Sequence, residues 1–93
     1  MLAIGRALMT KPRLLLLDEP LLGLAPSIQV RVIEAITSIR DRGITVLVAE
    51  QYARPVLPII GRGYIIESGA ITLAGTGKEL SENPHVRAAY FGV

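Results

Sequence analysis

Residues 14–20 read LLLLDEP, and this stretch decides the fold. Four apolar residues followed by two acids and a proline predict a short buried strand that stops at Pro20. A helix is the alternative for an apolar run, but this run is short and the proline ends it. Continuously apolar strands are typical of parallel sheets with both faces covered. We therefore expect Asp18 and Glu19 at the carboxyl end of a buried parallel strand.

A helix and a second apolar strand follow this stretch. Residues 26–42 begin with Pro-Ser, which favours a helix start, and Gly43 is a good terminator. The apolar stripe of this helix consists of Ile28, Val32, Ile36 and Ile39. Residues 45–49 read TVLVA and predict the second strand. The order strand, helix, strand predicts an α/β fold with a parallel βαβ unit, whose functional residues lie beyond the strand ends, where Gln51 also falls.

Weaker patterns fill the rest of the chain. A short helix is expected near the start, broken at Lys11-Pro12, because the residue before a proline avoids helical angles. Residues 64–74 predict a hairpin with a two-residue turn at Ser68-Gly69. The remaining expectations are a short helix over 54–60 that Pro55 and Pro58 disfavour, a turn or helix at 79–81, and a helix over 84–90 that stops at Gly92.

Composition bounds the function classes. The chain has 93 residues, 51% of them hydrophobic and 19% charged, which excludes disorder as its main state. It contains no cysteine and a single histidine, which excludes disulfides, thiolate metal sites and two-histidine sites within the chain. The net charge of +2 is a weak nucleic-acid signal, because the basic residues do not cluster with aromatic ones. The sequence shows neither a membrane-spanning run nor a leader, so a cytoplasmic location is expected.

Asp18 and Glu19 carry the candidate chemistry. A carboxylate at a strand tip can hold a hydrated Mg²⁺ against nucleotide phosphates. The adjacent Glu19 can orient or deprotonate a water aimed at the terminal phosphate. The alternative from the residues alone is an ordinary strand end with two solvated acids.

The stretch 14–20 resembles the Walker B segment of ABC transporter ATPases, and other motifs agree with it in order. These are residues 2–8 (LAIGRAL, like the helix after the signature motif), 21–26 (LLGLAP, at the D-loop), 45–51 (TVLVAEQ, leading to the switch position) and 62–69 (RGYIIESG, the following hairpin). The Gly-Leu-Ala-Pro run, the Glu-Gln pair and residues 85–92 are most similar to the ATP-binding subunit of branched-chain amino-acid importers. The resemblance implies part of a P-loop NTPase (ABC ATPase) fold with a C-terminal hairpin.

The resemblance also implies site roles. Asp18 would support Mg²⁺ through water, Glu19 would be the general base, and Gln51 would sense the γ-phosphate. Gly23 and Leu24 would contribute to the nucleotide site from a loop that faces a second subunit. Gln51 stands where the family usually has histidine, and glutamine cannot become positively charged. Ala25 replaces the aspartate of many D-loops.

Several motifs of the family do not occur in the sequence. It has no glycine-rich loop with Lys and Ser or Thr, no glutamine loop and no Ser-Gly-Gly signature. Residues 1–93 are therefore expected to be the C-terminal portion of a nucleotide-binding domain that binds ATP and Mg²⁺. The full-length protein would be an ATPase that pairs head-to-tail with a second ATPase subunit. It would bind membrane permease subunits at the cytoplasmic face of the inner membrane, and the 93-residue chain alone would be inactive.

Two other functions remain open from the sequence. The chain could be a non-catalytic truncated remnant or an association module, because the phosphate loop is missing. It could also derive from an ABC-type ATPase of DNA repair, but the small net charge argues against nucleic acid as a partner. Other residues have structural interpretations: His85 is expected at the surface or a helix start, and Tyr64 and Tyr90 are expected to be partly buried.

Overall fold

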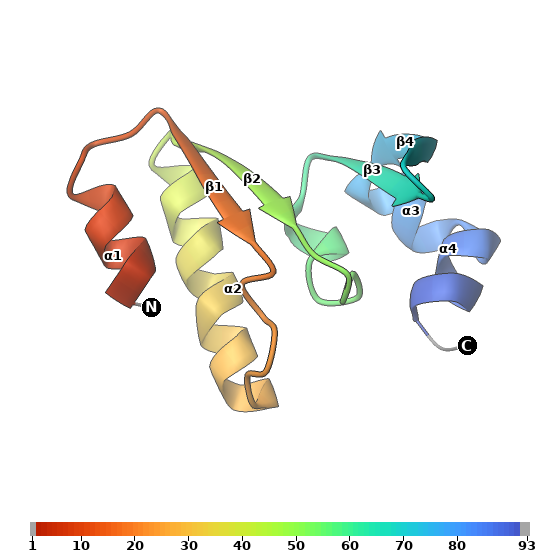
Figure 1. The fold of residues 1–93 in the computed structure, drawn as a ribbon, viewed down its shortest axis with the longest axis horizontal. Coiled ribbons are helices and arrows are strands. Elements are labelled where there is room, and N and C mark those ends of the chain that lie inside the picture. The colour runs from red at the N-terminus through yellow and green to blue at the C-terminus, as the bar shows by residue number, and fades with distance from the viewer. Residues whose placement is uncertain (1, 92–93) are drawn as a thin grey trace. The chain divides into compact units, whose positions relative to one another are not determined.

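The computed structural model describes residues 2–91 (Figure 1). The chain divides into two compact units at the junction between Glu50 and Gln51. Each unit is described by itself. No helix within residues 2–91 is long and apolar enough to cross a membrane.

The first unit contains the predicted βαβ arrangement. Its elements are α1 (Leu2–Leu8), β1 (Leu14–Asp18), α2 (Pro26–Asp41) and β2 (Thr45–Ala49). The strands β1 and β2 pair in parallel, with Leu14 opposite Thr45 and Asp18 opposite Ala49. The carboxyl ends of both strands therefore lie at the same edge, as the sequence predicted.

Helix α2 forms because its ends and its apolar face are both well specified. Pro26 occupies the first helical position, after Ala25 in extended conformation. The helix ends before Gly43, whose φ of 92° suits only glycine well. The predicted stripe is confirmed at its buried members, which are Val32, Ile36 and Ile39. Ile28, in the first turn, is 39% exposed and lies outside the core.

The sheet of the first unit is covered on one face only. Leu15 packs with Ile4 of α1 and Ile39 of α2, so both helices lie on the side to which Leu15 points. On the other face, Leu16 is 64% exposed and Leu47 is 60% exposed. The expectation of a strand buried on both faces was therefore wrong for this chain, because residues 2–50 provide helices for one face alone.

The second unit packs a hairpin against short helices. Its elements are η1 (Leu57–Ile59), β3 (Arg62–Glu67), β4 (Ala70–Thr76), α3 (Gly77–Glu82) and α4 (Pro84–Tyr90). The hairpin is antiparallel and turns at Ser68 and Gly69, whose φ angles of 51° and 79° match the mirror-image turn that hairpins favour. In place of the short helix expected over 54–60 the structure has only the 3₁₀ turn η1, because two prolines in this segment lack the N–H groups that a helix needs.

The core of the second unit is Leu57, Ile65, Leu80 and Val86. Close packing at the start of α3 requires glycine, because a Cβ on Gly77 would collide with the carbonyl oxygens of Leu57 and Ile60. Tyr90 packs against the core as expected, whereas Tyr64 is 54% exposed, which corrects the expectation of partial burial.

A capping box fixes the start of α3. The Glu79 N–H donates to Thr76 Oγ1 at 3.1 Å, and the Thr76 N–H donates to Glu79 Oε1 at 3.0 Å. The hydrogen bonds from the Thr76 backbone and side chain lower the pKa of Glu79 below its usual value. Helix α4 matches the prediction in its bounds, Pro84–Tyr90, while the expected stop at Gly92 lies outside the described residues.

Candidate functional site

The candidate site is built on the carboxyl end of β1. Asp18 is the last residue of the strand and is exposed. One residue further on, the Glu19 N–H donates to the Ala49 carbonyl at 2.7 Å, which continues the pairing with β2 beyond the strand itself. The backbone that carries both carboxylates is therefore held by the parallel strand pair.

Glu19 has an unusual backbone conformation. Its φ of 46° lies in the left-handed region, which residues other than glycine seldom adopt. Such conformations are unfavourable and persist where the surroundings impose them, often at functional sites. Here the turn that follows imposes it, since the Leu22 N–H donates to the Glu19 carbonyl at 3.1 Å. Asp18 still belongs to β1, whereas Glu19 is left-handed, so the two adjacent exposed carboxylates are carried by backbone of different conformation.

The loop after Glu19 is anchored by a buried leucine. Leu21 is 1% exposed, and its N–H donates to Glu50 Oε2 at 3.1 Å. The Leu21 carbonyl accepts hydrogen bonds from Gln29 Nε2 at 3.4 Å and from the Leu24 N–H at 3.2 Å. The loop carrying Gly23 and Leu24 is therefore fixed to both β2 and α2.

Glu50 is a site residue that the sequence reasoning missed. It appeared there only as part of the strand that leads to Gln51. Its position one residue after β2 was the available signal, because the ends of parallel strands meet at one edge. The structure shows that its carboxylate holds the loop that follows Glu19 by accepting the Leu21 N–H.

Gln51 directly follows Glu50 and opens the second unit. Its side chain is exposed. The structure thus places Asp18, Glu19, Gly23 and Leu24 in the first unit and Gln51 in the second.

The donor set suits a partial magnesium site. Within residues 2–91, no three carboxylate, imidazole or thiolate groups gather as a metal cluster. Asp18 offers one exposed carboxylate, which matches Mg²⁺ because this ion keeps several waters and needs only one or two protein carboxylates beside nucleotide phosphates. Gly23 has a φ of 74° and open space around the position of a Cβ, so its backbone is accessible to a ligand or a partner.

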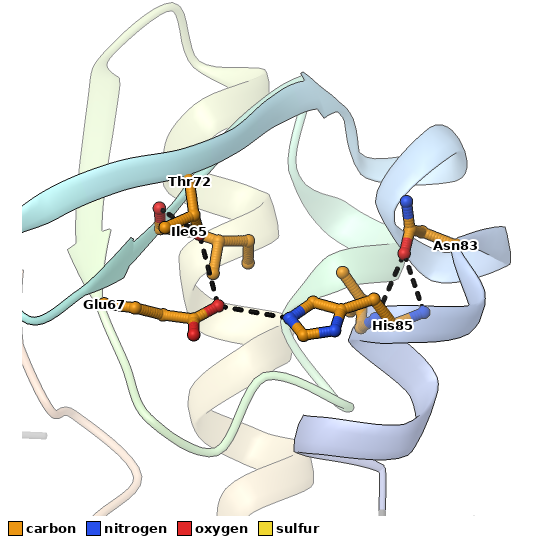
Figure 2. Close-up of polar contacts among 6 residues, drawn as sticks. Ile65, Glu67, Thr72, Asn83 and His85 are labelled. Atoms are coloured by element: carbon orange, nitrogen blue, oxygen red, sulfur yellow. Dashed lines mark hydrogen bonds and ion pairs between the residues drawn. The ribbon is translucent and has the colours of Figure 1, made fainter.

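A second polar cluster joins the hairpin to α4 (Figure 2). Glu67 Oε1 lies 3.3 Å from His85 Nε2 and accepts a hydrogen bond from Thr72 Oγ1 at 3.2 Å. Asn83 Oδ1 caps α4 by accepting from the N–H groups of His85 at 2.8 Å and Val86 at 3.1 Å. His85 is exposed and near the helix start, as expected, and its contacts are structural.

Comparison with curated proteins finds clear relatives. The chain is 53% identical over 92 residues to the high-affinity branched-chain amino acid transport ATP-binding protein BraG of Pseudomonas aeruginosa. It is 39% identical over 89 residues to the lipopolysaccharide export system ATP-binding protein LptB of Acidithiobacillus ferridurans. These matches cover 99% and 96% of this chain but 40% and 37% of the relatives, so the chain spans about two fifths of their length. No protein-family model matches the chain.

Solved structures give the same result. An ATP-binding cassette of an ABC transporter in its ADP conformation matches 97% of this chain and 37% of its own, with a TM-score of 0.80 and 33% identity. The protein cbiO1 of Clostridium perfringens, part of an ABC transporter complex, matches 92% of this chain and 35% of its own, with a TM-score of 0.81 and 26% identity. The fold of the chain is therefore that of part of an ATP-binding cassette, which confirms the predicted fold class.

Proposed function

We propose a function for this chain on the premise that it belongs with the ATP-binding proteins of ABC transporters, which are its homologues. We propose that it is part of an ATP-hydrolysing subunit that energises an importer of branched-chain amino acids. The observation that carries this proposal is the exposed Asp18-Glu19 pair, held at the carboxyl end of a parallel strand by pairing with β2. The similarity to BraG supports the amino-acid cargo, because it exceeds the 39% identity to the lipopolysaccharide export protein.

In this function Asp18 would hold a Mg²⁺ through water, and the ion when bound would supply charge neutralisation at the phosphates. Glu19 accepts a hydrogen bond from the attacking water and takes its proton as general base. Gln51 donates its side-chain amide to the γ-phosphate, where it acts as a neutral hydrogen-bond donor. The anchored loop presents Gly23 and Leu24 to the nucleotide site and to a second ATPase subunit. Glu50 supports this loop through the Leu21 N–H.

We further propose that residues 1–93 form the C-terminal portion of the nucleotide-binding domain. The support is the match to about two fifths of each relative, together with a sequence that has no phosphate loop or signature motif. The chain alone then hydrolyses no ATP, because most phosphate contacts are missing. The partners of the complete subunit are a second ATPase subunit and membrane permease subunits, which hold it at the cytoplasmic face of the inner membrane.

A chimera tests the catalytic role. The full 93-residue chain replaces the matching 92-residue segment of BraG, and both ATP hydrolysis and branched-chain amino-acid uptake are measured. We expect activity in both assays. Glu19→Gln should lower hydrolysis by about 10²-fold or more, in the range of a lost general base, and leave nucleotide binding intact. Glu34→Gln is the matched control, because Glu34 is an exposed acid on α2, and it should leave both activities unchanged.

The outcomes separate the alternatives. A folded chimera without ATPase activity would refute the catalytic proposal and favour a remnant that only associates. Normal hydrolysis in Glu19→Gln would refute the role of the base alone. Hydrolysis without amino-acid uptake would refute the cargo. The sequence of the DNA upstream of the Met1 codon tests the domain assignment, for which we expect a continued reading frame that encodes a glycine-rich Lys-Ser/Thr loop and a Ser-Gly-Gly signature.

A further inference from the structure

Two residues after Gln51, the chain is fixed to the core of the second unit. Ala53 packs against the core cluster of Leu57, Ile65, Leu80 and Val86. The Ala53 carbonyl accepts hydrogen bonds from the N–H groups of Val56 and Leu57, both at 3.0 Å. The groups that hold Ala53 and its neighbour Arg54 therefore restrain the backbone that follows Gln51.

The residue that follows α4 contacts the same part of the second unit as Ala53. Phe91 follows α4 and packs against the same core cluster as Ala53. The guanidinium carbon of Arg54 lies 5.9 Å from the centre of the Phe91 ring, and that of Arg87 lies 5.5 Å from it. The Phe91 N–H also donates to the Arg87 carbonyl at 3.1 Å, which fixes the ring relative to the helix. Both arginines are at cation–π distance from one aromatic side chain.

We propose that Phe91 is a positioning residue for Gln51, which rests on the function proposed above. Arg54 is three residues after Gln51, and its guanidinium is attracted to the electron-rich face of Phe91. Arg87 places a second cation at the same ring from α4. The end of α4 thereby restrains the segment 51–54 and determines where the Gln51 amide is presented.

The first test measures mobility in the 93-residue chain by ¹⁵N relaxation. Phe91→Leu keeps an apolar side chain but removes the ring. We expect the order parameters of the Gln51, Tyr52 and Ala53 amides to fall from about 0.85 toward about 0.6, while those of the hairpin stay unchanged. Phe91→Tyr keeps the ring and should restore the original values. His85→Ala is the control at the opposite end of α4, where it removes the contact with Glu67, and it should not affect residues 51–53.

The second test measures ATP hydrolysis in the BraG chimera. Phe91→Leu should lower kcat about tenfold with an unchanged KM for ATP, because misplacing a group that acts on the γ-phosphate affects the reaction more than the binding of the whole nucleotide. Phe91→Tyr should recover kcat. In a Gln51→Ala background, Phe91→Leu should cause no further loss, since both changes act through one side chain.

The two tests distinguish the failure of this inference from the failure of the proposed function. An inactive parent chimera would refute the proposed function. Unchanged order parameters at residues 51–53 in Phe91→Leu would refute the restraint, whatever the chimera does. A full additional loss of kcat in the Gln51→Ala background would show that Phe91 acts elsewhere and would overturn its positioning role.

Discussion

Replacing Glu50 tests how the site loop is held. Leu21 is 1% exposed, and its N–H donates to the Glu50 carboxylate at 3.1 Å. Glu50→Ala removes the acceptor and leaves a backbone donor beside the buried Leu21 side chain without this partner. We expect the chain to lose stability and the residues from Leu21 to Leu24 to become more mobile, because the hydrogen bond from Glu50 no longer holds Leu21, although the turn bonds and the contact with Gln29 remain.

The size of the effect follows from the hydrogen bond itself. A bond to a charged group contributes about 1.5–3 kcal/mol, and a buried donor without a partner costs about 1–3 kcal/mol. We therefore expect Glu50→Ala to lower the free energy of unfolding by about 2 kcal/mol. Glu50→Gln keeps an oxygen acceptor without the charge and should cost about 1 kcal/mol. With a urea slope of about 1–2 kcal/mol per molar, Glu50→Ala moves the unfolding midpoint by about 1–2 M.

The assay is urea unfolding followed by circular dichroism, with sucrose added to all samples so that the small chain is well folded at the start. Glu34→Ala is the control, because it removes an exposed acid from α2, and it should shift the free energy by less than about 0.5 kcal/mol. Equal losses for Glu50→Ala and Glu34→Ala would refute the reasoning. Unchanged backbone mobility of residues 21–24 in Glu50→Ala, measured by NMR relaxation, would also refute it.

Two further predictions concern burial and pH. Val32→Ala should lower the free energy of unfolding, measured in urea, by about 1–2 kcal/mol, because Val32 is 2% exposed. Val30→Ala on the same helix should change it by less than about 0.5 kcal/mol, because Val30 is 56% exposed. Equal losses for the two variants would contradict the assigned core face of α2. The pKa of Glu79 is lowered below its usual value of 4.5 by the Thr76 hydrogen bonds, so its contribution to stability is present above that pH and is lost as the pH falls through the lowered value. Urea midpoints between about pH 6 and pH 3 should therefore fall more steeply in the original chain than in Glu79→Gln, and parallel profiles would contradict this.

The sequence could predict the elements that local patterns define. Strand β2 was expected over residues 45–49 and lies at Thr45–Ala49, because a β-branched apolar run is bounded by Gly43 and a polar pair. The hairpin turn at Ser68-Gly69 was predicted for a similar reason, since few residue pairs tolerate two positive φ angles. The placement of Asp18 and Glu19 at a strand end followed from the strand itself.

Other features depend on partners distant in sequence and could not be predicted. Leu16 and Leu47 were expected to be buried, but the apolar run does not say whether a chain supplies cover for both faces. The bond between Glu50 and Leu21 joins residues 29 positions apart. Folding also brings Arg54, near the start of the second unit, to the ring of Phe91 near its end.

The backbone conformation of Glu19 depends on residues at the end of β2. The left-handed conformation of Glu19 persists only because neighbouring groups hold it, and two backbone bonds do so. The Glu19 N–H donates to Ala49, and the Glu19 carbonyl accepts from Leu22 in a loop that Glu50 anchors. Ala49 and Glu50 are consecutive residues at the end of β2, so a one-residue slip of β2 against β1 would remove both supports at once. The register of two strands therefore determines the geometry of the proposed catalytic base, and changes at Glu50 should affect hydrolysis although Glu50 itself is not proposed to contact the nucleotide.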